Sequence, residues 1–513
     1  MPTTNPPTAQ AEKLDKDVLK VAGVVVLAAI MSILDVTVVS VALPTFQAEF
    51  QATYAQVAWT MTGYTLALAT VIPLTGWAAD RFGTKRLFLL ALVLFVAGSV
   101  LCSLADDIST LVFFRVLQGL GGGMLMPLGM TIMTRAAGPQ RIGRVMAVLG
   151  VPMLLGPIGG PILGGWLIDT ASWKWIFLIN LPIGIVALAF AATVLPSDSP
   201  EPSESFDFVG MLLLSPGLAL FLYGVSSSPE TGTLLAAKVL VPATIGAMLV
   251  VGFVFHAFRT VHPLIDLHLF KNRQLTVAVI TMSLFAIAFF GASLLFPSYF
   301  LQVRGETTLA AGLLLAPQGL GAMVSMPISG VLADKIGAGK IVQVGIVLIA
   351  LSMSVFTQVG ADTSYGLLLG SLFVMGLGMG ATMMPIMTAA LQTLTDHTLA
   401  RGSTLMNIVQ QVAGSIGTAV ISVVLTNGYQ ARAAADTLVR SAQDPTVAAQ
   451  LTPASIAQGL SEMADAFGIA FMVATALIVL TLVPAAMLPR TKPPVADETE
   501  TETADLTPPV LTH

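Results

Sequence analysis

The sequence has little charge and almost no cysteine for its length of 513 residues. Only 10% of the residues are Asp, Glu, Lys or Arg, whereas soluble domains contain about 25%. So few charged residues could not cover the surface of a soluble fold of this length. The single cysteine, Cys102, excludes an intrachain disulfide.

Motifs for enzymatic chemistry are also missing. No GxxxxGK[ST] segment is present to cradle nucleotide phosphates, which excludes an ATP-driven pump of that kind. The five His are scattered, and no catalytic constellation or metal cluster can be recognised; three of them surround one loop, His256, His262 and His268. We therefore predict a protein that is not an enzyme, needs no cofactor or metal, and binds no nucleic acid.

Long apolar segments, in contrast, recur along the whole chain, and 55% of the residues are hydrophobic. A membrane-spanning helix needs about 20 apolar residues. On that rule we predict fourteen spans, near 21–43, 54–79, 86–105, 108–133, 145–168, 175–195, 208–225, 236–257, 274–301, 308–333, 341–360, 364–393, 403–427 and 465–488. The first 20 residues contain no apolar core, so we expect the first span to be retained and not removed as a signal peptide.

Lys and Arg predict the orientation, because cytoplasmic loops carry an excess of both. With the N-terminus inside, Arg115 alone lies within a span, and only five of the 23 Lys and Arg fall outside the cell: Lys174, Lys238, Arg304, Arg432 and Arg440. We therefore predict that both termini are cytoplasmic.

The two ends of the chain resemble each other in sequence. "GWAADRFGTK" at 76–85 matches "GVLADKIGAGK" at 330–340, and "GLGGGMLMP" from Gly119 matches "GLGMGATMMP" from Gly376. Pro44 and Pro73 match Pro297 and Pro327, so that all offsets lie between 253 and 257 residues. An even number of spans separates the copies, which predicts parallel repeats around a central site, as in many transporters.

The predicted architecture is therefore six plus two plus six helices. Its parts are a cytoplasmic segment at 1–20, a six-helix bundle at 21–195, a linker with two inserted helices at 196–273, a second bundle at 274–488 and a disordered acidic tail at 489–513.

Five motifs, in order along the chain, resemble those of one family. They are "LDVTVVSVALP" from Leu34, "GWAADRFGTKR" from Gly76, "RVLQGLGGG" from Arg115, "GPIGGPILGG" from Gly156 and "WKWIFLINLPIG" from Trp173. This order is similar to that of the fourteen-helix drug:proton antiporters of the major facilitator superfamily, the EmrB/QacA group. Ser40 departs from that pattern, because the group usually has Asn there.

The resemblance implies roles for two of these motifs. In the loop between the second and third helices, Gly76, Asp80, Arg81 and Gly83 would form a conformational latch, the alternative being a cytoplasmic anchor. In the fifth helix, Gly and Pro remove side-chain bulk and backbone hydrogen bonds, which allows close packing and bends. Generic packing is the simplest interpretation there, and the resemblance adds a pliable seal formed by Gly156, Pro157, Gly159, Gly160 and Pro161.

Two charges lie inside predicted spans at the same depth. Asp35 lies eight residues before the predicted helix end at Leu43, and Arg115 lies seven residues after Ile108. At 1.5 Å per residue both are about 10–12 Å below the outer boundary. We expect Asp35 to carry protons, since burial favours the neutral carboxyl and a nearby Arg115 favours the carboxylate; a structural ion pair is the alternative.

Polar, aromatic and Met residues on central helices are candidates for contacts with the transported compound, because ligand sites are mostly apolar with a few polar groups. They are Trp59, Tyr64, Met124, Met126, Phe289, Phe296, Tyr299, Gln318, Asn407, Gln410 and Gln411. Each is individually as well explained by ordinary packing. The tenth helix contains no acid, which argues against recognition of dications.

The resemblance implies a monomeric exporter in the bacterial cytoplasmic membrane, which exchanges lipophilic, cationic drugs and dyes for protons and thereby confers antibiotic resistance. A rival interpretation keeps the fold but exports one endogenous metabolite, siderophore or lipid. A non-transporting membrane sensor is a third.

Overall fold

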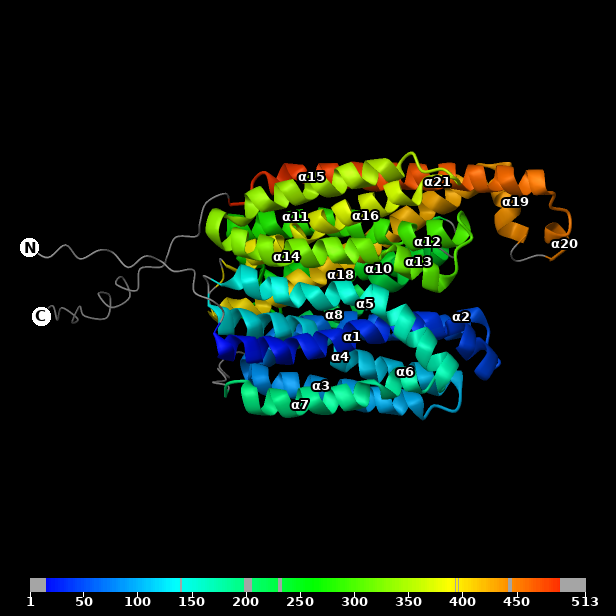
Figure 1. Ribbon diagram of the computed structural model, residues 1–513. Coiled ribbons are helices and arrows are strands. Elements are labelled where there is room, and N and C mark those ends of the chain that lie inside the picture. Colours follow the sequence, from blue (N-terminus) through cyan, green and yellow to red (C-terminus); the bar gives the residue numbers. More distant parts are fainter. Residues whose placement is uncertain are drawn as a thin grey trace, which may run out of the picture.

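Long helices running side by side make up the computed structural model of the chain (Figure 1). It describes residues 15–489, except 139–140, 198–204, 229–232, 393, 395 and 442–444. The helices of the first part are α1 (Lys16–Glu49), α2 (Tyr54–Phe82), α3 (Thr84–Ser103), α4 (Ile108–Ala137), α5 (Ile142–Thr170), α6 (Trp175–Leu178), α7 (Asn180–Val194), α8 (Phe208–Ser226) and α10 (Ala237–Ala257). Those that follow are η1 (Leu267–Lys271), α11 (Arg273–Ser293), α12 (Leu295–Gln302), α13 (Thr308–Leu314), α14 (Ala316–Ile336), α15 (Ala338–Phe356), α16 (Tyr365–Gly380), α17 (Met383–Leu391), α18 (Asp396–Gln430), α19 (Ala433–Ser441), α20 (Pro445–Ala448), α21 (Pro453–Leu480) and α22 (Leu482–Ala485).

The predicted class, an all-α polytopic membrane protein, is confirmed. Thirteen helical segments of the described residues are long and apolar enough to cross a membrane. The 29-residue helix α5 runs alongside them and corresponds to one further predicted span. Together they agree with the predicted fourteen spans. No β-strand occurs in the described part of the chain.

Three predicted helix ends are wrong by six residues or more, and one of them is the start of α18, at Asp396 and not near 403. α1 continues past Leu43 to Glu49 with Pro44 inside it, and α21 begins at Pro453 and not near 465. Hydropathy marks where a chain leaves the membrane, whereas a helix goes on as long as its backbone hydrogen bonds are formed. The predicted outer loop at 428–464 is accordingly mostly helical, with α19 and α20 at the tip of the molecule (Figure 1).

α1 begins and α22 ends at the same end of the bundle, on the left in Figure 1. We call this end the terminal face and the opposite end, with α19 and α20, the far face. The predicted segments at 1–20 and 489–513 lie outside the described residues except for 15–20 and 489.

The predicted repeat is visible in the packing. In the first half α2 and α3 pack on α4, and α1 packs on α5; in the second half α14 and α15 pack on α16, and α11 packs on α18. The two equivalent turns also share one backbone conformation, with φ 92° and ψ 143° at Gly83 and φ 87° and ψ 143° at Gly337. Glycine adopts positive φ at little steric cost. The domain limits at 21–195, 196–273 and 274–488 stay a prediction.

The two halves meet along two seams, α2 against α18 and α5 against α14. In the first seam the nearest approach to Gly76 comes from Arg401 and Thr404, whose atoms would lie 3.3 Å from an added Cβ. In the second seam an added Cβ on Gly330 would lie 2.5 Å from the Gly143 carbonyl oxygen. Both approaches are near the terminal face, so the halves are in close contact there.

Glycines hold α5 against α1. A Cβ on Gly156 would lie 2.0 Å from Ile33 Cγ2, and one on Gly160 would lie 1.9 Å from Thr37 Oγ1. These glycines are four residues apart and therefore share one face of α5. The packing is looser at Gly159, where an added Cβ would lie 3.7 Å from its nearest neighbour, Leu34 Cδ2. The structure does not describe the side chains of Pro157 and Pro161. Small residues at such seams let membrane helices approach closely.

We expect Gly160→Ala to destabilise the protein, because the new methyl group overlaps Thr37. Overpacking of this kind costs about 1–3 kcal/mol of unfolding free energy. Thermal unfolding of the purified protein in lipid nanodiscs measures the effect. Gly165→Ala is the matched control on the same helix, since an added Cβ there meets nothing within 4 Å. Equal melting temperatures for the two variants would contradict the packing argument.

Candidate functional site

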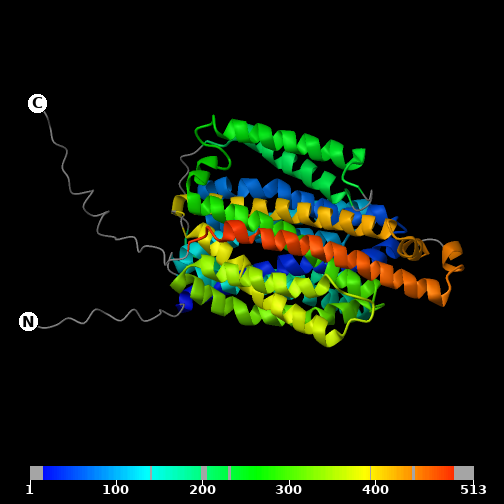
Figure 2. The same ribbon diagram turned by 90° about the horizontal axis from the view of Figure 1, so that it is seen from above.

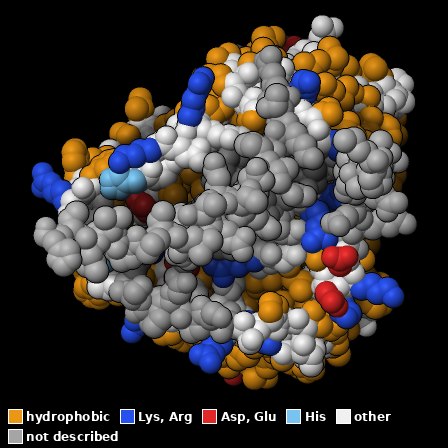
Figure 3. Space-filling view, turned by 90° about the vertical axis from the view of Figure 1, so that its left-hand side faces the viewer, with side chains coloured by type: hydrophobic (Ala, Val, Ile, Leu, Met, Phe, Trp, Pro, Cys, Tyr) orange, Lys and Arg blue, Asp and Glu red, His pale blue; other side chains and the backbone are white. Residues whose placement is uncertain are grey.

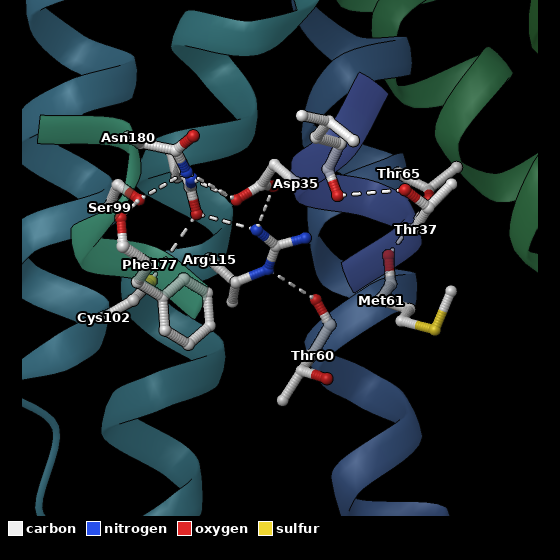
Figure 4. Close-up of polar contacts among 12 residues, drawn as sticks. Asp35, Thr37, Thr60, Met61, Thr65, Ser99, Cys102, Arg115, Phe177 and Asn180 are labelled. Carbon is white, nitrogen blue, oxygen red and sulfur yellow. Dashed lines mark hydrogen bonds and ion pairs between the residues drawn. The ribbon is translucent and has the colours of Figure 1, made fainter. Parts of the chain in front are cut away.

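Asp35 and Arg115 form a buried ion pair. Arg115 Nη1 lies 2.5 Å from Asp35 Oδ2, and the two residues are 1% and 2% exposed. Figure 4 shows the two side chains pointing toward each other from α4 and α1. The prediction that they share a depth in the bundle thus agrees with their contact. Removing one partner of such a pair would leave an uncompensated buried charge.

Two amides that the sequence analysis did not single out complete the environment of the carboxylate. Gln118 Nε2 donates to Asp35 Oδ1 at 2.8 Å, and Asn180 Nδ2 donates to the same oxygen at 3.3 Å. Gln118 also accepts from Arg115 Nη1 at 2.7 Å. Both Asp35 oxygens therefore accept hydrogen bonds, an arrangement that suits the ionised carboxylate. Two features of the sequence could have identified these amides. Each is a single amide in an apolar run, and Gln118 follows Arg115 by three residues, which places both on one face of the helix.

The break between α6 and α7 places Asn180. Pro182 has no N–H to donate to the carbonyl four residues earlier, so a continuous helix is disfavoured here. α7 begins at Asn180, whose side chain also donates to Ser99 Oγ at 3.0 Å. Ser99 in turn donates to the Phe177 carbonyl at 2.9 Å. The predicted span at 175–195 is confirmed as one segment, Trp175–Val194, which contains a break between α6 and α7 beside Asp35.

The glycines of "RVLQGLGGG" bring α2, α3 and α4 together around the pair. A Cβ on Gly121 would lie 2.5 Å from Phe95 N on α3, and one on Gly119 would lie 2.7 Å from the Tyr64 carbonyl oxygen on α2. This close approach lets Arg115 Nε donate to the Thr60 carbonyl of α2 at 3.1 Å. The first half thus supplies every described hydrogen-bond partner of the pair.

Tyr64 connects the ion pair to a cavity. Its ring centroid lies 4.1 Å from the Arg115 guanidinium carbon, a cation–π arrangement. Tyr64 is 1% exposed, and its hydroxyl forms no hydrogen bond of good geometry with the residues that the structure describes. The same residue lines the cavity described next. An unpaired buried hydroxyl at a cavity wall is available to a bound molecule.

A cavity of about 540 Å³ lies between the two halves. Its walls come from α1, α2, α4 and α8 on one side and from α11 and α18 on the other. The lining residues are Ser32, Ile33, Val36, Thr37, Tyr64, Leu68, Ile72, Gly122, Gly123, Met126, Pro127, Val225, Ser226, Phe290, Asn407, Gln410, Gln411, Gly414, Ser415, Thr418 and Ala419. None of these lining residues is charged. The wall on α18 is polar, and the opposite wall is mostly apolar.

The structure brings only part of the predicted substrate set to this cavity. The members that line it are Tyr64, Met126, Asn407, Gln410 and Gln411. The members that do not are Trp59, Met124, Phe289, Phe296, Tyr299 and Gln318. Phe296 packs among Phe356 and Phe471, and Tyr299 donates to the Gly360 carbonyl at 2.7 Å. Trp59 stacks on Tyr223 of α8, outside the lining.

The corresponding positions of the second half carry no charge. Ala288 and Leu372 stand where the first half has Asp35 and Arg115, and both are fully buried. The ion pair is therefore a property of one half only. If the repeated fold needed this ion pair for its stability, both halves should contain one.

The predicted latch residues lie where α2 meets α18. Asp80 Oδ2 is 3.4 Å from Arg401 Nε, an ion pair that joins the two halves near the terminal face. Gly76 lies one turn away against the same arginine, and Gly83 ends α2. Arg81 is exposed. The partner of Asp80, Arg401, was not predicted as a latch residue, because nothing in the sequence aligns α18 with α2.

No group of three or more His, Cys, Asp and Glu that could hold a metal ion occurs among the described residues.

Comparisons with known proteins agree with the motifs. A sequence profile of the Major Facilitator Superfamily matches residues 25–418. The chain is 52% identical over 493 residues to the multidrug resistance protein B homolog of Mycobacterium tuberculosis (strain ATCC 25618 / H37Rv), covering 93% of this chain and 91% of that protein. It is 31% identical over 405 residues to the multidrug export protein EmrB of Escherichia coli (strain K12), covering 78% and 79%.

Solved structures of low sequence identity share the fold. The human organic anion transporter MFSD10 (TETRAN) superposes with a TM-score of 0.60 at 16% identity, covering 92% of this chain and all of that one. The proton:xylose symporter XylE superposes with a TM-score of 0.57 at 15% identity, covering 92% and 97%. The predicted fold is therefore confirmed by structure as well as by sequence.

We expect Gln118→Ala to slow dye efflux about tenfold, which corresponds to roughly 1.4 kcal/mol, while the protein still folds. The substitution removes a donor to Asp35 and an acceptor for Arg115. Efflux from proteoliposomes and the melting temperature are the two measurements. Gln343→Ala is the control, because Gln343 is a partly buried glutamine that donates to the Ala485 carbonyl outside the network. Equal efflux rates in the two variants would remove Gln118 from the site.

We expect Asp80→Arg or Arg401→Asp alone to weaken transport, because each places like charges in contact between the halves. The double variant Asp80→Arg with Arg401→Asp restores opposite charges, so its transport should recover to within a few-fold of wild type. Such recovery defines a coupling energy between the two positions. A double variant no better than the worse single variant would exclude the latch.

Proposed function

The chain belongs to the major facilitator superfamily, and from that premise we propose that it exports lipophilic drugs and dyes in exchange for protons, by alternating access. Membership makes the chain a transporter and not an enzyme, as the motifs predict. The buried ion pair of Asp35 and Arg115 is the observation that carries the proposal of proton coupling. Two relatives described above, a multidrug resistance protein B homolog and a multidrug export protein, support drugs as the cargo.

In the proposed cycle Asp35 is the proton carrier. Each of its oxygens accepts a hydrogen bond from a side-chain donor, and we assign this arrangement to the proton-free step of the proposed cycle. A proton on the carboxyl would replace the contact with Arg115, since a neutral acid binds a guanidinium much less strongly than a carboxylate does. Protonation and separation of the pair are therefore linked.

Helix α2 would pass this change to the rest of the molecule. It contacts Arg115 through the Thr60 carbonyl and the Tyr64 ring, lines the cavity with Tyr64, and ends near Asp80 in the ion pair with the other half. A movement of Arg115 would thus shift the cavity wall and the latch together. One continuous helix, with Pro73 inside it, links the three sites.

The cavity favours lipophilic cargo with spread-out charge. None of its lining residues is charged, and the sequence at 151–161 of the neighbouring α5 contains no ionisable residue either. Its amide groups lie on α18, whereas the opposite wall combines apolar residues and Met126 with the hydroxyls of Ser32, Thr37, Tyr64 and Ser226. Delocalised monocations such as ethidium need no carboxylate partner, because aromatic, thioether and amide groups stabilise them. Compact dications would lack a counter-charge.

We propose that the terminal face is cytoplasmic in a bacterial cytoplasmic membrane. Figure 3 shows more Lys and Arg than Asp and Glu side chains on the described part of this face. Basic residues flank cytoplasmic helix ends. The halves are in contact there, so the structure would correspond to a state closed toward the cytoplasm. One chain supplies the pair, the cavity and the latch, which fits a working monomer.

We expect Asp35→Asn to abolish gradient-driven ethidium efflux while leaving the protein folded in the membrane. Asparagine keeps the shape of the side chain and resembles the neutral carboxyl that the proposed cycle itself passes through, so folding should survive, but it cannot exchange a proton. The measurement is ethidium movement in proteoliposomes with and without an imposed proton gradient, with wild type and variant side by side.

Asp169→Asn is the matched control, because Asp169 is an exposed acid at the far end of α5 and should leave efflux unchanged. Efflux that survives in Asp35→Asn would reduce the pair to a structural role. Absence of ethidium efflux in wild type as well would favour the export of an endogenous compound.

A further inference from the structure

The inserted helices α8 and α10 pack as one hairpin on a single side of the bundle. Figure 2 shows this green hairpin next to the blue α2 and the gold α18. A Cβ on Gly224 would lie 2.6 Å from Ala243 N, and one on Gly246 would lie 2.4 Å from Phe221 N. The backbone of each helix thus packs directly against a glycine of the other helix. Contacts this close join the two helices into one stiff unit.

The two helices of the hairpin have different surroundings. Leu214, Leu218 and Leu222 of α8 are buried and spaced by four residues, so that they share one face toward the bundle. α10 instead exposes its large apolar side chains, including Val251 at 53% and Phe255 at 63%. α8 is therefore the inner helix, and α10 is suited to face lipid.

α8 touches both halves of the protein. It packs on α2 of the first half, where Tyr223 stacks on Trp59 with ring centroids 5.7 Å apart, and it also contacts α18 of the second half. Near the terminal face α2 and α18 meet directly at Gly76 and Arg401. Farther along they line opposite sides of the cavity, and the end of α8 lies against both.

The last residues of α8 are part of the cavity lining. Val225 and Ser226 line the cavity together with Tyr64 of α2 and Gln411 of α18; Val225 is buried and Ser226 is exposed. On the other side of the molecule α5 contacts α13 and α14 directly. The second seam therefore needs no added element, whereas the first seam has α8 beside it.

We propose that the α8–α10 hairpin is the third wall of the substrate cavity, and that Val225 and Ser226 are specificity-determining residues. The hairpin closes the α2–α18 side of the cavity to lipid chains, and the small residues at its tip set the room available to the cargo. Because Tyr223 stacks on Trp59, the hairpin moves with the first half and slides on α18. This proposal rests on the proposed export function, which supplies the cargo.

Cysteine labelling tests the wall without requiring transport. Ser226→Cys, Leu68→Cys and Val251→Cys are each reacted with a charged, water-soluble maleimide in proteoliposomes. Leu68 lines the cavity from α2 and Val251 lies on the lipid side of α10. Native Cys102 is fully buried, so wild type gives the background. Position 226 should react at a rate close to that of position 68 and at least about tenfold faster than position 251, because thiolates form only where water reaches. A rate at position 226 as slow as at position 251 would overturn the proposal.

Bulk at the same position tests specificity. Ser226→Trp should reduce ethidium efflux by about tenfold or more, since filling a pocket changes discrimination on that scale, whereas Val251→Trp should leave it unchanged. Equal efflux in the two variants would overturn the specificity role. Ethidium protection of Leu68→Cys from labelling tests the export function separately: if position 68 is not protected, the proposed function fails, while the rates at 226 and 251 still decide the wall.

Discussion

The ion pair of Asp35 and Arg115 is the interaction on which the arrangement of the first half depends. Burying two charges in a membrane bundle is expensive unless every lone pair and every proton finds a partner. Here α1 and α4 supply the charges, and α2, α3 and α7 supply hydrogen-bond partners or hold them in place. The helices must come close enough for side chains of ordinary length to meet. The glycines of α4 and α5 make that approach possible.

The two halves then have different tasks on the same scaffold. The first half holds the ionisable pair, and the second half presents amides and hydroxyls to the cavity from α18. The repeat explains why both halves share one packing pattern and one turn conformation. It does not explain the charges, which have no counterpart at Ala288 and Leu372. The two halves therefore share a framework but differ in chemistry, with the ionisable pair in one half and the polar wall in the other.

Sequence reasoning reached the fold and the centre of the site because both rest on strong local signals. Apolar length identifies spans, and depth along a span placed Asp35 and Arg115 at one level, where the structure shows them in contact. Gln118 and Asn180 were missed because their direction depends on helix rotation and on the break before Asn180. Asn407, Gln410 and Gln411, predicted as polar residues of a central helix, do line the cavity, and their spacing of three and four residues places them on one helical face. Phe296 and Tyr299 gave no such pattern, and aromatic residues suit a core as well as a cavity. The place of α8 was beyond reach, because the hairpin belongs to neither repeat.

The confinement of both charges to one half has an electrical consequence. While the carboxylate is ionised, Asp35 and Arg115 cancel, and that half is neutral at its centre. When the proposed proton binds, the guanidinium remains, and the same half carries one positive charge within the membrane. Moving one such charge across the whole membrane changes its free energy by about 2.3 kcal/mol at a potential of 100 mV. Voltage would thus drive the loaded half directly, and a neutral cargo would be exported electrogenically, whereas a monovalent cation exchanged for one proton would leave the membrane potential unchanged.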